Sequence, residues 1–269
     1  TADYNAEMIE QVARFPRVRD RALFVGGHED VVDRPFGPGL PNIRDWTAQH
    51  YDFPGYVLPF DPADFADREG LRARLGFRAD QRVVLAAVGG TAVGQHLLRK
   101  VVEACPAMKR SVPDLRVIVI TGPRIDPAAL PATPGVEYRR FVPDLYAHLA
   151  ACDLAIVQGG LSTCMELTAT RRPFIYVPLR NHFEQNVHVP HRLARYGAGV
   201  RLDYADINPE TLAHAIADGL KRPVTYRDVE VGGARRAAEM LAPLLEGAAD
   251  EPRPRARAGA GAGGSPRAL

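Results

Sequence analysis

The chain has 269 residues, enough for one large domain or two smaller ones, and its 46% hydrophobic and 25% charged residues are ordinary for a soluble globular protein. A net charge of +2 provides no bulk attraction for a polyanion, so nucleic acid is not expected as a partner. No apolar run approaches the roughly 18 residues that a membrane-spanning helix needs. The three cysteines lack any Cys-x-x-Cys spacing, which suggests reduced thiols in a cytosolic protein.

The first part of the chain predicts only a few short elements. Apolar spacing and turn residues indicate a helix over 2–14, a strand over 22–25, a helix over 42–50 and an extended piece over 55–59. The chain starts with Thr1, within a helix-like pattern, so we expect a fragment or a processed product.

From residue 82 onward, short apolar runs alternate with segments of helical spacing. The strands are predicted over 83–88, 115–120, 135–138, 154–157, 174–177 and 200–202. The helices are predicted over 67–75, from the glycines at 89–94 to about 105, around 145–149, over 161–171, 190–196, 209–220 and 233–245. This alternation predicts an α/β fold with a doubly wound, parallel, Rossmann-like sheet between about 80 and 222. The tail over 247–269 contains mostly Ala, Gly, Pro and Arg and is expected to be disordered.

The central motif of the sequence is a glycine turn between a strand and a helix. Gly159 and Gly160 follow the apolar run 154–157, and the hydroxyls of Ser162 and Thr163 come next. Free N–H groups and the helix dipole at such a place favour an anion, most often a phosphate. Glu166, one turn later, is suited to accept hydrogen bonds from a ribose diol. An ordinary capped helix after a strand is the structural alternative.

A second glycine turn follows the strand at 83–88. It contains Gly89, Gly90, Thr91 and Gly94, and it lacks the Lys-Ser/Thr pair of a P-loop. Because the carboxyl ends of parallel strands meet at one edge of the sheet, both turns would face the same ligand. The pair therefore favours a ligand that contains phosphate, although each turn on its own is equally consistent with a purely structural turn.

Polar residues follow the strand at 174–177. Glu184 and Gln185 offer groups suited to sugar hydroxyls, and a solvated loop is the alternative. No metal is expected, because His182, His188 and His191 are irregularly spaced. Cys164 is not expected to act as a nucleophile, because no catalytic base is apparent beside it. The segment 141–144 either packs in the core or forms one wall of a pocket for a nucleobase.

Together these motifs resemble the carboxyl half of the GT-B glycosyltransferases of family 28, over residues 82–222. That family includes the bacterial enzyme that adds N-acetylglucosamine to the lipid-linked muramyl-pentapeptide precursor. The motifs that carry the resemblance are Gly159-Gly160-x-x-Thr163-x-x-Glu166, Arg172-Pro173, Val177-Pro178, Glu184-Gln185-Asn186 and Gly197-Ala198-Gly199. Departures are Gly94, which comes one position late, Ala92 in place of a polar residue, and Val187-His188-Val189-Pro190 in place of the usual Asn-Ala.

The resemblance implies a role for each motif. The donor diphosphate would be bound by Gly90, Thr91, Gly160 and Thr163, the ribose by Glu166, the nucleobase by Phe141 and Val142, and the sugar by Glu184 and Gln185. Residues 59–246 would be the donor-binding domain, and residues 1–58 the remnant of an amino-terminal acceptor domain with its linker. The general base is unassigned, with His96 and His182 as weak candidates.

The expected function is an inverting, metal-independent hexosyltransferase without a cofactor. Its donor would be UDP-N-acetylglucosamine or a related UDP-sugar, and its acceptor a lipid-linked or small molecule. The expected location is cytoplasmic, either free or at the membrane surface. Two alternatives remain: a non-hydrolysing sugar-nucleotide 2-epimerase, and a non-catalytic donor-binding subunit that needs a partner chain. The expected partners are the donor, the acceptor, and a missing amino-terminal domain or partner chain.

Overall fold

A computed structural model describes residues 2–15, 19–90 and 92–247. Its main element is a six-stranded sheet in the order β5-β4-β3-β6-β7-β8, in which every neighbouring pair is parallel. The strands are β3 (Arg82–Ala87), β4 (Leu115–Ile120), β5 (Val136–Arg139), β6 (Leu154–Val157), β7 (Phe174–Tyr176) and β8 (Val200–Arg201). The prediction of a parallel α/β sheet is confirmed.

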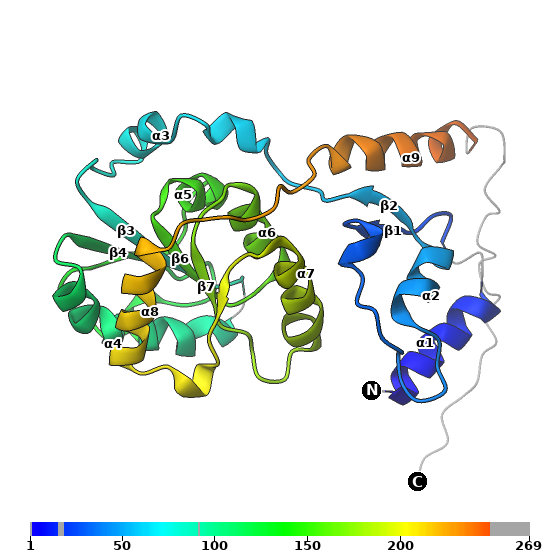
Figure 1. Cartoon of the computed structure of the whole chain (residues 1–269), viewed down its shortest axis with the longest axis horizontal. Helices are drawn as coiled ribbons and strands as arrows, with labels where there is room; N and C mark the ends of the chain where they lie inside the picture. Colours follow the sequence, from blue (N-terminus) through cyan, green and yellow to red (C-terminus); the bar gives the residue numbers. More distant parts are fainter. Residues whose placement is uncertain (1, 16–18, 91, 248–269) are drawn as a thin grey trace, which may run out of the picture.

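Helices cover both faces of this sheet (Figure 1). Val84 and Ala86 of β3 face the apolar cluster that includes α4 and α8, while Val83 and Leu85 face the cluster that includes α5, α6 and α7. The helices are α3 (Arg68–Arg74), α4 (Gln95–Ser111), α5 (Leu145–Ala151), α6 (Leu161–Ala169), α7 (Val189–Tyr196) and α8 (Pro209–Lys221). The central strands are buried on both faces, which explains their continuous apolar runs.

The beginning and the end of the described chain form a second, smaller unit beside the sheet (Figure 1). It consists of α1 (Ala2–Arg14), β1 (Leu23–Val25), α2 (Ile43–His50), β2 (Asp52–Gly55) and α9 (Gly233–Gly247). β1 and β2 pair in parallel, and α9 packs against β2, where Arg236 donates a 2.6 Å hydrogen bond to the carbonyl of Pro54. We call residues 2–15 and 19–55 together with α9 the small unit.

Residues of α7 join the sheet domain to the small unit. The buried carboxylate of Asp30 accepts a 2.8 Å hydrogen bond from Arg195, and Arg192 donates a 3.0 Å hydrogen bond to the carbonyl of Val25. The Nε2 atom of His191 lies 3.1 Å from the carbonyl oxygen of Glu29. The contact between the two units is therefore polar and specific.

Most predicted boundaries are displaced by one or two residues, and two elements differ from the prediction by more. The extended piece expected over 55–59 is β2, which ends at Gly55, because its pairing with β1 covers 52–55. The helix expected to end near residue 105 is α4, which continues through Pro106 to Ser111 because Ala107 and Met108 remain buried. None of the helices within the described ranges has the length and apolar character needed to cross a membrane. The tail over 248–269 lies outside the described residues.

Candidate functional site

The glycine turn after β6 leaves the first N–H groups of α6 available to a ligand. Gly159 has a φ of +85°, a left-handed conformation that glycine adopts readily, and Gly160 is the N-cap residue of α6. Gly160 supplies no side chain to cap the helix, and a Cβ built on it would meet no atom of the described residues within 4 Å. This arrangement offers N–H donors, a positive dipole end and open space to an anion.

The glycine turn after β3 has the same open character. A Cβ built on Gly89 or Gly90 would also meet no atom of the described residues within 4 Å. Gly94 is different, because a Cβ there would lie 2.4 Å from that of Val88, so this glycine is required by packing. The predicted phosphate ligand Thr91 lies outside the described residues.

The two turns border one small cavity of about 80 Å³. It is lined by Ala87, Val88, Gly89, Leu145, Val157, Gln158, Gly160, Thr163 and Gln185. The structure therefore brings together three of the predicted site residues, Gly160, Thr163 and Gln185, and places Gly89 next to the predicted Gly90. Both turns do face the same space, as the sequence suggested.

Glu166 lies one turn after Thr163 on α6. Burial raises the pKa of the Glu166 carboxyl above its ordinary value. No described residue donates a hydrogen bond to its carboxylate, so the acceptor is free for a ligand hydroxyl. A partly buried acid without a partner of its own is typical of a functional position.

The segment after β7 is held in place by its own side chains. Gln185 is buried, and its Oε1 accepts a 2.9 Å hydrogen bond from the N–H of Leu179, which leaves its amide nitrogen without a partner among the described residues. Asn186 donates to the carbonyls of Leu179 and His182 at 2.6 and 2.8 Å. These residues belong to a π-helical turn over Glu184–His188, an irregularity that is frequent at functional sites. Glu184 is exposed and does not line the cavity.

The loop between β5 and α5 contains the two predicted nucleobase residues. Phe141 is 73% exposed, whereas Val142 is buried in the apolar core. Neither side chain lines the 80 Å³ cavity, but the loop continues into α5, whose first residue, Leu145, does. The nucleobase role of Phe141 and Val142 stays a prediction.

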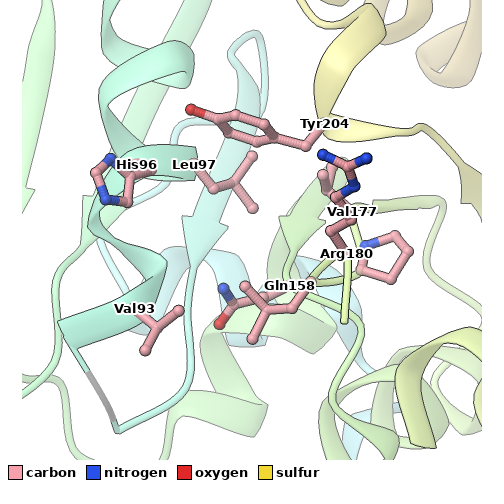
Figure 2. Close-up of a pocket in the computed structure, with 9 residues that line it drawn as sticks. Val93, His96, Leu97, Gln158, Val177, Arg180 and Tyr204 are labelled. Carbon is pink, nitrogen blue, oxygen red and sulfur yellow. The ribbon is translucent and has the colours of Figure 1, made fainter. Parts of the chain in front are cut away.

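A second, larger hollow of about 390 Å³ shares Gln158 with the 80 Å³ cavity (Figure 2). It is lined by Val93, His96, Leu97, Gln158, Val177, Pro178, Leu179, Arg180 and Tyr204. The sequence interpretation assigned no role to Gln158 or Arg180. Their positions in the sequence indicate a role in binding, because each residue follows the carboxyl end of a buried strand, where α/β sheets bind ligands. Among the described residues, no three His, Cys, Asp or Glu side chains come together as a metal site would require.

Curated relatives of the chain are glycosyltransferases. An uncharacterized glycosyltransferase of Methanopyrus kandleri is 29% identical over 217 residues, which are 77% of this chain and 60% of the relative. The UDP-N-acetylglucosamine--N-acetylmuramyl-(pentapeptide) pyrophosphoryl-undecaprenol N-acetylglucosamine transferase of Corynebacterium glutamicum is 33% identical over 205 residues, which are 76% of this chain and 51% of that enzyme. The chain spans about half the length of the curated relatives it matches.

Among solved structures, the calicheamicin glycosyltransferase CalG4 aligns with 90% of this chain and 55% of its own, at 17% identity and a TM-score of 0.48.

The model of the glycosyltransferase family 28 C-terminal domain matches residues 84–231. This segment is more than half of the chain and contains both glycine turns and every predicted site residue. The expected fold class, the carboxyl half of a GT-B glycosyltransferase, agrees with that match. The chain therefore belongs to glycosyltransferase family 28, and residues 84–231 form the carboxyl-terminal domain of that family.

Proposed function

We propose that this chain binds a nucleotide-sugar donor, UDP-N-acetylglucosamine or a related UDP-sugar, and acts in glycosyl transfer. The observation that carries the proposal is the convergence of two open glycine turns on one cavity. Each turn opens a helix whose dipole favours an anion, and together they suit the two phosphates of a nucleoside diphosphate. The family to which the chain belongs supports the class of reaction.

The proposed donor extends from the glycine turns in two directions. Its diphosphate lies against Gly90, Gly160 and Thr163, and its ribose hydroxyls donate to the free carboxylate of Glu166. Its sugar reaches the unpartnered amide nitrogen of Gln185 and the exposed Glu184. The base contacts the loop of residues 141–142, through the Val142 backbone and the Phe141 ring.

The proposed reaction is a single displacement. An acceptor hydroxyl oxygen attacks the anomeric carbon, the bond from that carbon to the β-phosphate oxygen breaks, and the nucleoside diphosphate leaves with the electron pair. The hydroxyl proton passes to a general base, for which exposed His96 and His182 remain candidates. Attack opposite the leaving group inverts the anomeric centre. The N–H groups at the start of α6 would stabilise the charge that develops on the diphosphate, and we propose that this is sufficient without a metal ion.

Calorimetry with UDP, dTDP and GDP tests the donor proposal. UDP should bind more tightly than dTDP and GDP, and Glu166→Ala should weaken UDP binding roughly 10- to 100-fold, because a hydrogen bond to a charged group contributes about 1.5–3 kcal/mol. Absence of heat for all three nucleotides, in a folded sample, would refute the proposal.

An activity assay separates transfer from the other possible uses of a bound donor. UDP release from UDP-N-acetylglucosamine is followed with membrane-extracted lipids, for this chain alone and for a version extended upstream in its reading frame. Acceptor-dependent release by either version supports transfer. Formation of an epimerised donor without acceptor would instead assign the 2-epimerase reaction, and donor binding without turnover in both versions would assign a binding subunit.

A further inference from the structure

Tyr56 lies where the sheet domain and the small unit are connected. It directly follows β2, and the second connection, which leads into α9, passes beside it (Figure 1). The two backbones are so close there that a Cβ built on Gly233 would lie 2.3 Å from the carbonyl oxygen of Tyr56. The Tyr56 side chain is only 5% exposed and belongs to the apolar cluster that includes Cys164 and Met165 of α6. Tyr56 therefore packs into the sheet domain at the junction of the two units.

The ring of Tyr56 also contacts the buried guanidinium of Arg192. The Cζ atom of Arg192 lies 5.7 Å from the centroid of the Tyr56 ring and 5.4 Å from that of the Phe24 ring in β1. A guanidinium that faces aromatic rings at such distances is attracted by them, most strongly where water is excluded. Since Arg192 also donates to the carbonyl of Val25, the small unit fixes the position of this guanidinium, and the guanidinium in turn holds the Tyr56 ring.

The hydroxyl of Tyr56 reaches the first turn of α6, where it interacts with the hydroxyl of Ser162. A buried tyrosine hydroxyl usually finds a hydrogen-bond partner, and no other described residue is hydrogen-bonded to this one. Burial raises the pKa of Tyr56, so its hydroxyl remains a donor at neutral pH. Ser162 is exposed, and its hydroxyl makes no hydrogen bond with the backbone of the described residues. The Ser162 proton is therefore available to a ligand at the start of α6.

We propose that Tyr56 is a positioning residue for the donor diphosphate and acts through Ser162. Tyr56 donates a hydrogen bond to the Oγ atom of Ser162, which directs the Ser162 proton toward a phosphate oxygen at the open start of α6. Each hydrogen bond in such a chain polarises the next one and strengthens it. This inference rests on the proposed function, and it adds to the phosphate site a residue that does not itself touch the ligand. Through Arg192, it also connects the small unit with that site.

Calorimetry of the intact chain with UDP tests this role. Tyr56→Phe keeps the ring and its contact with Arg192 but removes the hydroxyl, so UDP affinity should fall about 3- to 10-fold, the effect of one hydrogen bond. Ser162→Ala removes the group that contacts the phosphate and should weaken UDP binding about tenfold. In the double variant, Tyr56→Phe should add no further loss, because it acts only through Ser162. Tyr226→Phe, at a tyrosine that packs on Phe174 at the amino end of β7, is the matched control and should leave UDP affinity unchanged.

Melting curves verify that each variant is folded. Unchanged UDP affinity in Tyr56→Phe or in Ser162→Ala would overturn the positioning role, and the donor site would stand. The same conclusion follows if the loss caused by Tyr56→Phe persists when residue 162 is alanine, or if Tyr226→Phe loses as much affinity. If folded wild type binds no UDP, the donor proposal fails and this inference fails with it. A loss in Tyr56→Phe that disappears in the Ser162→Ala background supports both.

Discussion

The carboxylate of Asp30, in the small unit, accepts a 2.8 Å hydrogen bond from Arg195 on α7, and 165 residues of sequence separate the two. Asp30 is 2% exposed, and a second guanidinium, that of the almost fully buried Arg192, lies 3.9 Å away. The N–H of Gly27 completes the set of donors at 2.8 Å. One buried acid thus connects the two parts of the molecule.

Asp30→Ala should destabilise the chain by about 3–5 kcal/mol, because it leaves the buried Arg192 without a counter-charge. Urea unfolding followed by circular dichroism measures the change in the free energy of unfolding. Asp45→Ala is the control and should leave unfolding unchanged, because Asp45 is exposed on α2 and forms no ion pair with any described residue. A similar small effect for both variants would mean that the contact between the units contributes little to stability.

A second buried acid, Asp153, fixes the amino end of the sheet. Its carboxylate accepts hydrogen bonds from Arg68, Arg72 and the N–H of Val83, at 2.8, 3.0 and 2.7 Å. Burial raises the pKa of Asp153, but these hydrogen bonds and the two positive charges outweigh burial, and the pKa ends below its ordinary value.

Asp153→Ala should therefore cost about 3–5 kcal/mol at neutral pH, because Arg72 is buried and would lose its partner. Since the folded-state pKa is lowered, this contribution is present above the unfolded pKa and is lost as the pH falls through the folded value. Unfolding curves at several pH values should thus show wild type and variant converging in acid. Asp80→Ala, which removes an exposed pair with Arg78, should have no measurable effect. A difference between Asp153→Ala and wild type that is independent of pH would contradict this account.

Substitution of one glycine in each turn should distinguish an effect on ligand binding from an effect on stability. Gly160→Ala adds a methyl group in open space at an ordinary φ of −66°, so stability should fall by no more than about 1 kcal/mol. UDP affinity should fall at least about tenfold, because the methyl group occupies the proposed diphosphate position. Gly94→Ala should destabilise by about 1–3 kcal/mol, since its methyl group overlaps Val88. Calorimetry measures UDP binding by both variants, and thermal melting measures their stability. Unchanged UDP binding by Gly160→Ala would mean that the start of α6 does not bind the diphosphate.

The sheet could be predicted because its strands are buried on both faces. Val83 to Ala87 are at most 4% exposed, and such runs stand out against the polar helices between them. Pro106 shows the limit of local rules. A proline removes one helix hydrogen bond and costs about 3 kcal/mol, yet α4 continues because Met108 is fully buried against the sheet. Burial of that kind depends on the tertiary structure and is not visible in the local pattern.

The part of the candidate site that binds through backbone N–H groups could be predicted from the sequence. Gly160 and Thr163 are recognisable because a strand, a glycine turn and a helix have a local signature. Arg192, at the contact between the two units and outside this site, gives no such signal, because an arginine on an amphipathic helix looks like a solvated residue. Its burial depends on a segment more than 160 residues away. Gln158 gives no local signal either, since only the folded structure shows that no described residue makes a hydrogen bond with its amide.

We predict that Glu166 sets the pH dependence of the proposed donor binding. The carboxylate must be ionised to accept hydrogen bonds from the ribose, and burial raises the pKa of Glu166 in the free chain. Donor affinity should therefore be constant above that raised pKa and should fall as the pH drops through it. This fall should occur at a higher pH than it would for a glutamate with an ordinary pKa.

UDP-N-acetylglucosamine is the probe for this test, because its phosphates do not change charge in this pH range. Calorimetry from pH 8 to about pH 4.5 should show the decline in wild type, with proton release on binding at the lower pH values. Glu166→Gln keeps the shape, should bind more weakly, and should show no such decline. A parallel decline in both proteins would mean that another group titrates, and that Glu166 does not contact the ribose.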